Sequence, residues 1–507
     1  MKKTALALAI ALSSIALVGC GSSSSGGGSP TTSSTASSTA SSTTSSSADS
    51  SSSAAVVNEY AFSVEGDSTV SYTGQTARHV MIEDIKSMIG SMTKGAETGI
   101  TDRLMTLYQN PSNSQDGEAI LLKTGDFTLD QTVYSDISAG KNLQGKIAGG
   151  YIADGTPSGE TGTLIGEFVG SGMPAGTLPS TYVEAMFTEL GALAAASSDV
   201  MVSVAGEPQA VTAPYISAQG VDYQQLVQKF LLMAVGFSQG VNDYLKPSRD
   251  FANELGKAEG KEDKPYSTAE HHFDEGFGYF GAIPTYSSYT DAEISTASYI
   301  DEDASGSINL KNEYNFGQSI NCAKRDKGTA SNANPTDFTG DISAALYAGR
   351  TIVAEATAAG SLSAEQEDQL RTQIKQVALT WEMCIAATVV HYINDVKSDI
   401  AKFDGTDYVD VAHFTDLAKH WSEMKGFALG LQFSPYSPLR TEMGTFADIT
   451  YGSNTATLED VLTWMGVAPV LADATDADKE SYVEALDSAR AVLQAAYDFD
   501  ADNVANW

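Results

Sequence analysis

The sequence is poor in histidine, cysteine and basic residues. Its 507 residues include six His, three Cys and four Trp, and 29 Lys and Arg stand against 64 Asp and Glu. The formal net charge of −35 argues against nucleic acid and anionic lipid as partners, because both carry the same sign. With so few histidines, the sequence supports no Ser-His-Asp triad, and it contains no His-Glu-x-x-His zinc-protease motif.

Long apolar runs are also missing after the N-terminus, so no later segment is predicted to span a membrane. The chain begins with two lysines and a mostly apolar stretch that ends in Leu17-Val18-Gly19-Cys20, a pattern typical of a secretory signal. This ending resembles a bacterial lipobox, which implies that residues 1–19 are the signal peptide and that Cys20 carries a lipid. Gly21, where inner-membrane retention usually needs aspartate, favours the outer membrane. A plain cleaved signal is the alternative.

The cysteines left after a lipidated Cys20 are Cys322 and Cys384. Export would place both in an oxidising compartment, where disulfides persist. The sequence cannot show whether their Cα atoms approach within bonding range. A disulfide and two free thiols therefore both remain open.

The chain after the signal divides by composition into a tether and a folded part. Residues 20–58 are nearly all Ser, Thr, Gly and Ala, which predicts a flexible tether with nothing to bury. In residues 59–507 the apolar positions recur with helical spacing almost throughout, most clearly over 221–244 and 364–403. The sequence therefore predicts an all-α fold, a two-lobed helical bundle with long irregular loops, of which residues 110–179 form the longest.

Two short motifs each place a glutamate three residues after a histidine. They are His272-x-x-Glu275 and His420-x-x-Glu423, and each is followed by Gly-Phe. Residues i and i+3 lie on the same face of a helix, so each imidazole would point the same way as its carboxylate. We expect the first helix to break at the glycines that follow, Gly276, Gly278 and Gly281.

These four side chains form a candidate metal site if the two motifs face each other. Imidazole and carboxylate ligands suit transition metals, and helical bundles build such sites from i, i+3 pairs on facing helices. The predicted cofactor is therefore iron or zinc. The alternative is that each glutamate only orients its histidine by a hydrogen bond inside the protein.

An acidic stretch from Asp301 to Glu313 follows the pattern of an EF-hand-type calcium loop. Oxygen-bearing side chains alternate, and Gly306 stands at the position of the sharp turn. The twelfth position is an asparagine, and the glutamate comes one residue late. The predicted Ca²⁺ ligands are Asp301, Asp303, Ser305, Ser307, Asn309, Asn312 and Glu313. An acid-rich turn that caps the next helix is the alternative.

Three stretches resemble the imelysin-related bacterial lipoproteins, and more closely a family of domains of unknown function grouped beside imelysin. They are residues 72–79 (Tyr-x-Gly-Gln-Thr-Ala-Arg-His), residues 271–281, and residues 315–317 leading to 323–326. His272 and Glu275 match the His and Glu of imelysin's Gly-x-His-x-x-Glu motif, but Glu270 replaces its glycine.

This resemblance implies a two-lobed imelysin-like helical domain over residues 59–507, a periplasmic or cell-surface location, and a link to iron uptake with an outer-membrane transporter as partner. It also implies that Arg78 and His79 line the ligand site. His271 and Asp274 are the neighbouring alternates to the first motif.

Together these observations predict a binding protein: an outer-membrane lipoprotein that holds a metal or a small metal-bearing ligand between two helical lobes. Two alternatives are kept. One is a metal-dependent, peptidase-like hydrolase in which Glu275 or Glu423 acts as general base on a metal-bound water. The other is a structural surface protein that Ca²⁺ stiffens at the acidic loop.

Overall fold

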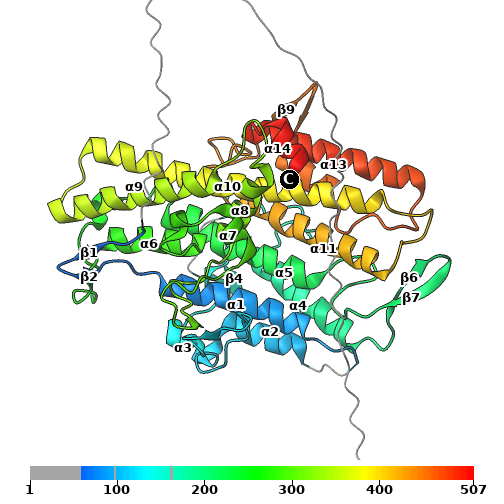
Figure 1. Cartoon of the computed structure of the whole chain (residues 1–507), viewed down its shortest axis with the longest axis horizontal. Coiled ribbons are helices and arrows are strands. Elements are labelled where there is room, and N and C mark those ends of the chain that lie inside the picture. Colours follow the sequence, from blue (N-terminus) through cyan, green and yellow to red (C-terminus); the bar gives the residue numbers. More distant parts are fainter. Residues whose placement is uncertain (1–58, 96–98, 160–163) are drawn as a thin grey trace, which may run out of the picture. The chain divides into compact units, whose positions relative to one another are not determined.

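The computed structural model describes residues 59–95, 99–159 and 164–507 (Figure 1). The predictions of a signal peptide over residues 1–19, a lipid on Cys20 and a tether over residues 20–58 lie outside these residues. Residues 56–507 form one compact unit. Its division into two helical lobes stays a prediction.

Helices dominate the described part of the chain, which confirms the all-α fold with loops. The fourteen α-helices there are α1 Thr73–Gly90, α2 Ile100–Gln109, α3 Tyr134–Ile137, α4 Pro179–Ala195, α5 Tyr223–Leu231, α6 Thr268–Phe280, α7 Asp291–Thr296, α8 Gln318–Thr329, α9 Phe338–Ala359, α10 Ala364–Ile400, α11 Val411–Ala428, α12 Leu458–Trp464, α13 Asp476–Tyr497 and α14 Ala501–Asn506.

The strands of the described residues are short and pair only two at a time. Four pairs are antiparallel: β1 Ser63–Val64 with β2 Asp67–Ser68, β4 Tyr151–Ala153 with β5 Thr156–Ser158, β6 Val200–Val204 with β7 Glu207–Val211, and β9 Ile449–Tyr451 with β10 Asn454–Ala456. The fifth pair, β3 Thr128–Leu129 with β8 Ser307–Ile308, is parallel. Each antiparallel pair is a hairpin within one loop, and the parallel pair joins two loops that lie far apart in the sequence.

The longest described helix, α10, organises the helices around it. It begins with a capping box in which Ser363 caps the backbone and Gln366 returns the hydrogen bond. Apolar residues at helical spacing, including Leu370, Ile374 and Val377, are fully or almost fully buried. α9 and α11 pack along it, and α8 and α13 contact it as well (Figure 1). A disulfide joins Cys322 on α8 to Cys384 on α10, with the Cα atoms 5.0 Å apart.

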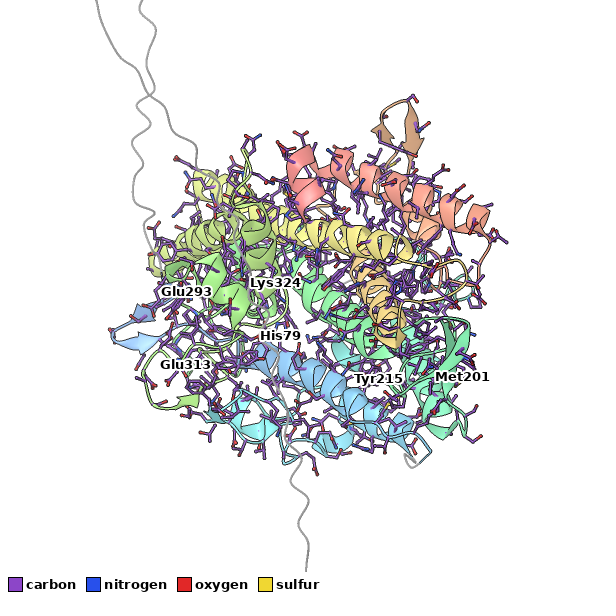
Figure 2. The ribbon with its side chains drawn as sticks, turned by 45° about the vertical axis from the view of Figure 1, so that its right-hand side comes forward. His79, Met201, Tyr215, Glu293, Glu313 and Lys324 are labelled. Carbon is purple, nitrogen blue, oxygen red and sulfur yellow. A yellow bond between two sulfur atoms is a disulfide. The ribbon has the colours of Figure 1, made fainter. Side chains whose placement is uncertain are left out.

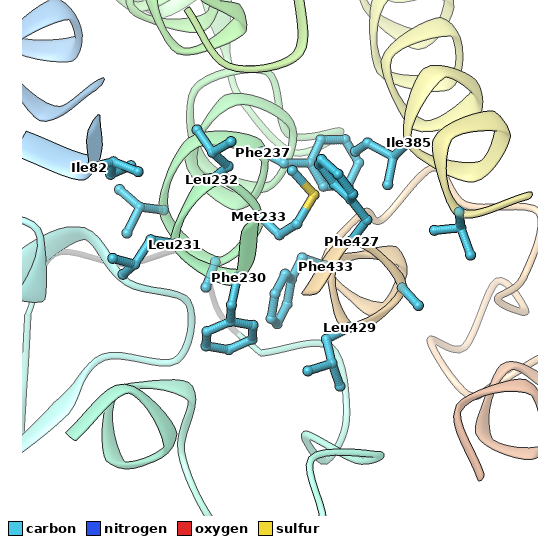
Figure 3. Close-up of a cluster of buried hydrophobic side chains, with 14 of the residues drawn as sticks. Ile82, Phe230, Leu231, Leu232, Met233, Phe237, Ile385, Phe427, Leu429 and Phe433 are labelled. Carbon is cyan, nitrogen blue, oxygen red and sulfur yellow. The ribbon is translucent and has the colours of Figure 1, made fainter. Parts of the chain in front are cut away.

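The core includes the region where α5 runs on into wider turns. After Leu231 the helix continues as two π-helical segments, Leu232–Phe237 and Gly240–Tyr244. Side chains of the first segment pack among aromatic and aliphatic side chains from α10 and α11 (Figure 3). The second segment ends on Asp243 and Tyr244, which line a cavity. π-Helical turns are rare and frequently mark functional sites.

The first histidine motif lies on α6, and its glycines do not break the helix as expected. α6 passes through Gly276 and Gly278 and ends only at Gly281, whose φ of +83° is strained for any other residue. A Cβ at Gly276 would lie 2.8 Å from the Leu245 side chain, and one at Gly278 would lie 2.5 Å from Cβ of Tyr72. These glycines therefore permit close helix packing.

Candidate functional site

A polar cavity of about 840 Å³ opens beside the first histidine motif. Its walls come from the start of α1, from residues 138–146, from the second π-helical segment, from the loop before α6, and from α6 itself. Six basic side chains and only two acidic ones, Asp243 and Glu275, line it. The basic ones are Arg78, Lys141, Lys146, Arg249, Lys261 and Lys264. In a chain with so few basic residues, this pocket is markedly electropositive.

Two of these cations form no ion pair with an acidic side chain in the part of the chain that the structure describes. Arg78 is buried on α1, and its guanidinium donates to the backbone carbonyls of Asn142, at 2.9 Å, and Gly74, at 3.2 Å. No ion pair found among the described residues includes Arg78 or Lys141, although the charge of Glu275 acts on Lys141 and opposes the lowering of its pKa. Burial and the neighbouring Arg78 charge lower the pKa of Lys141. The positive charge of this wall is therefore left for a ligand to compensate.

The side chains of α6 supply the rest of the recognition surface. His271 stacks on Tyr266 with ring centroids 4.8 Å apart, and its Nδ1 lies 3.1 Å from the Ser71 carbonyl oxygen. Burial lowers the pKa of His271, so the ring stays neutral at pH 7. Glu275 accepts a hydrogen bond from the Gln75 amide at 2.9 Å. Neutral donors, aromatic faces and fixed cations thus surround the cavity.

His272 is held by an ionic network at the edge of the cavity. Its Nδ1 lies 2.9 Å from Glu254 Oε2 and 2.7 Å from the Arg249 guanidinium. Arg249 also pairs with Asp243 at 3.5 Å. Although burial opposes ionisation, His272 and Arg249 hold the pKa of Glu254 below its usual value. The network positions Arg249 and occupies one ring nitrogen of His272.

The second motif lies on α11 in a different setting. His420 Nδ1 is 2.7 Å from Asp399 on α10, and Glu423 pairs with Lys229 on α5 at 3.1 Å. Although burial opposes protonation, Asp399 and Asp395 raise the pKa of His420.

The structure does not bring the four predicted metal ligands together. His272 and Glu275 line the large cavity, but His420 and Glu423 do not. Within the described ranges, no group of three or more His, Cys, Asp or Glu ligand atoms close enough to share a metal includes any of the four. The physical reason is that each side chain already has a partner nearer than its counterpart in the other motif.

Two of the four predicted ligand-lining residues also lie elsewhere. Arg78 and His271 line the cavity, whereas His79 and Asp274 are buried away from it. His79 stacks on Phe316, and its Nε2 contacts the carbonyl oxygens of Gly278 and Tyr279 at 3.2 and 3.1 Å. Asp274 forms a fully buried ion pair with Arg350 at 2.8 Å. His79 therefore joins α1 to α6, and Asp274 joins α6 to α9.

The acidic loop gathers three of its predicted calcium ligands. Oxygen atoms of Asp301, Asp303 and Glu313 lie within 4.8 Å of one another, and Figure 2 marks the position of Glu313. Glu313, one residue late in the sequence pattern, is the member that closes the group. Its carboxylate also accepts hydrogen bonds from the backbone of Glu302, at 3.0 Å, and Asn309, at 2.8 Å. α8 begins only at Gln318, so the loop does not cap that helix.

If this loop binds Ca²⁺, the ion will raise the melting temperature. Ca²⁺ at 100 times its dissociation constant adds about 2.7 kcal/mol to the free energy of unfolding. Thermal unfolding with Ca²⁺, with Mg²⁺ and with chelator measures this, and Asp303→Asn should abolish the shift. Equal melting temperatures for the wild type in all three conditions would rule out a calcium site here.

Most of the cavity's cations carry no signal in the sequence. Arg78, Lys141 and Arg249 come from three separate segments with no common spacing, and only the fold brings them together. The lysine-rich loop over residues 256–264, directly before the first histidine motif, is visible in the sequence as a local cluster of basic residues. It contributes Lys261 and Lys264.

The fold and the cavity define an all-α protein built around an electropositive pocket. The chain belongs to the family described as Domain of unknown function (DUF4856), whose model matches residues 180–438, just over half of its length. The matched part contains α6 and α11, while Arg78 and Lys141 precede it. No curated protein and no solved structure matches the chain.

None of the helices in the described residues is long and apolar enough to cross a membrane.

Proposed function

We propose that this protein is an extracytoplasmic binding protein whose pocket beside α6 holds a small, multiply charged anion. The observation that carries the proposal is the excess of basic over acidic side chains around a cavity of about 840 Å³. Carboxylate- or phosphate-bearing molecules fit this chemistry, because fixed guanidinium and ammonium groups form charge-assisted hydrogen bonds with them.

The neighbours of the cations support binding of a ligand over a purely structural role. Structural cations in proteins are usually paired when buried. Here Arg78 is only 8% exposed and donates to neutral carbonyl oxygens. A bound anion would supply the missing charge, and Tyr72, Tyr244 and Tyr266 would flank it.

A metal enters this proposal as part of the ligand. An anionic metal chelate would satisfy the cations and keep the link to iron uptake that the resemblance to imelysin-related lipoproteins implies. The same resemblance, with the lipobox ending at Cys20, supports an outer-membrane anchor and a transporter partner. His272 and Glu275 would then contact the ligand from α6.

Binding of a panel of anions by isothermal titration tests the proposal. The panel contains citrate, ferric citrate, a sugar phosphate and a neutral sugar. We expect at least one anion to bind saturably and Lys141→Gln to weaken it about tenfold or more, the usual effect of losing one charge-assisted bond. The neutral sugar should not bind.

Lys375→Gln is the matched control, because Lys375 is an exposed lysine on α10 outside the cavity. It should bind the anion as the wild type does. Equal weakening in both variants would mean a general charge effect, and no binding of any anion would overturn the proposal. Elemental analysis of the wild-type complex separates a metal chelate from a metal-free anion.

A further inference from the structure

We propose a second anion site, for a single tetrahedral oxyanion group such as phosphate or sulfate, in a separate small cavity between α1, α5 and the start of α8. The cavity has a volume of about 170 Å³, one fifth of the larger one, and shares no lining residue with it. Lys86 on α1, Lys229 on α5 and Lys324 on α8 line it.

A fully buried amide in the wall points to a ligand. Asn315 has no exposed surface, and its Oδ1 accepts the backbone N–H of Ile283 at 3.0 Å. Its Nδ2 has no hydrogen-bond acceptor within the described part of the chain. An unsatisfied buried donor costs about 1–3 kcal/mol, so such groups normally have a partner. A bound oxyanion would be that partner.

Two of the three lysines, Lys86 and Lys324, are available to bind the oxyanion. Lys229 is already bound to Glu423 and to the side-chain oxygens of Gln225 and Gln228. Neither Lys86 nor Lys324 has an acceptor for its ammonium group among the residues described. Lys324, labelled in Figure 2, is exposed on α8.

The start of α8 adds a third kind of donor. Gly317 is the N-cap residue and lines the cavity, and no side chain caps the helix. The first N–H groups of an uncapped helix favour an anion through hydrogen bonding and the helix dipole. Only one acidic side chain, Glu83, lines the cavity, and it accepts a hydrogen bond from Gln228 at 2.6 Å.

The charges around Lys86 make binding depend on pH. The charge of Lys229, together with burial, lowers the pKa of Lys86 to about 8. Glu83 and Glu423 act in the opposite direction, and Lys324 adds to the lowering. Lys86 therefore loses its positive charge as the pH rises through about 8, and affinity for an anion of constant charge falls over the same range.

Sulfate titration of the full-length protein at pH 6.5 and pH 9 tests the proposal. Because the larger cavity also attracts anions, the titration is done in the Lys141→Gln background. We expect saturable binding that is about tenfold weaker in both Lys86→Gln and Lys324→Gln. The loss of affinity from pH 6.5 to pH 9 should become smaller in Lys86→Gln, where only Lys324, whose pKa burial also lowers, remains to lose its charge.

Lys327→Gln is the control, because Lys327 is an exposed lysine on the same helix outside the cavity. It should bind sulfate like its parent. Inorganic phosphate and phenyl phosphate distinguish a free ion from a phosphate group on a larger molecule, and binding of either supports the site. Sulfate binding that is unaffected by Lys86→Gln and Lys324→Gln, or absent in the Lys141→Gln background, would overturn it.

Discussion

Replacing Arg350 by alanine is expected to lower the free energy of unfolding by about 3–5 kcal/mol, the usual effect of breaking a buried ion pair. Arg350 has no exposed surface. Its guanidinium bonds Asp274 at 2.8 Å, Glu270 at 3.0 Å and the Thr69 hydroxyl at 3.0 Å. Without it, two buried carboxylates lose their only cation among these contacts.

The effect should extend to the N-terminal segment of the folded unit. Asp274 also accepts hydrogen bonds from the Tyr60 hydroxyl and the Ser71 backbone, both at 3.0 Å. The Arg350 network therefore joins residues 60–71 to α6 and α9. We expect hydrogen exchange of this segment to accelerate in Arg350→Ala.

Denaturant unfolding measures the change, and Lys94→Ala is the control. Lys94 pairs with Asp199 at 3.3 Å on the surface, where an ion pair contributes at most about 1 kcal/mol. Arg350→Lys should restore little of the lost free energy of unfolding, because an ammonium group cannot bond three partners in the planar geometry of a guanidinium. Unfolding of Arg350→Ala at the wild-type denaturant concentration would contradict the assigned role.

Removing the disulfide is expected to lower the free energy of unfolding by about 2–4 kcal/mol. Cys322 and Cys384 are 62 residues apart and both have no exposed surface. The bond restricts a long loop in the unfolded chain, and it ties α8, which carries few apolar residues, to α10. The double variant Cys322→Ala/Cys384→Ala should unfold at lower denaturant.

Reduction of the wild type provides the matched comparison for that variant. Reduced wild type should approach the stability of the double variant, whereas the reductant should leave the variant unchanged. If the oxidised wild type and the double variant unfold at the same denaturant concentration, the disulfide does not stabilise the fold.

Much of the helical framework could be predicted from residue spacing. The helix expected over 364–403 is α10, Ala364–Ile400, because Ser363 marks its start and apolar residues recur along one face. The helix α8 was missed, since its sequence is mostly polar and only tertiary contacts bury Cys322 and Ala323. The hairpin β6–β7 was missed as well, although its residues alternate around an Ala205-Gly206 turn.

The make-up of the cavity depends on tertiary packing in a similar way. The first motif supplies His271, His272 and Glu275 to the cavity wall, although its local spacing indicates a helical face and no cavity. A pairing between two motifs 148 residues apart depends on how helices pack, which local spacing does not encode. The basic side chains that set the charge of the cavity come from segments of no common pattern.

The most direct test of the account is the effect of Glu275→Gln on binding of the anion that the pocket prefers. Glu275 is one of two carboxylates in the cavity, and glutamine keeps an oxygen for the Gln75 amide. We predict that removing this negative charge tightens anion binding severalfold, opposite in sign to Lys141→Gln. Weaker anion binding in Glu275→Gln, together with loss of a bound metal ion, would show that the pocket is a metal site and contradict the account.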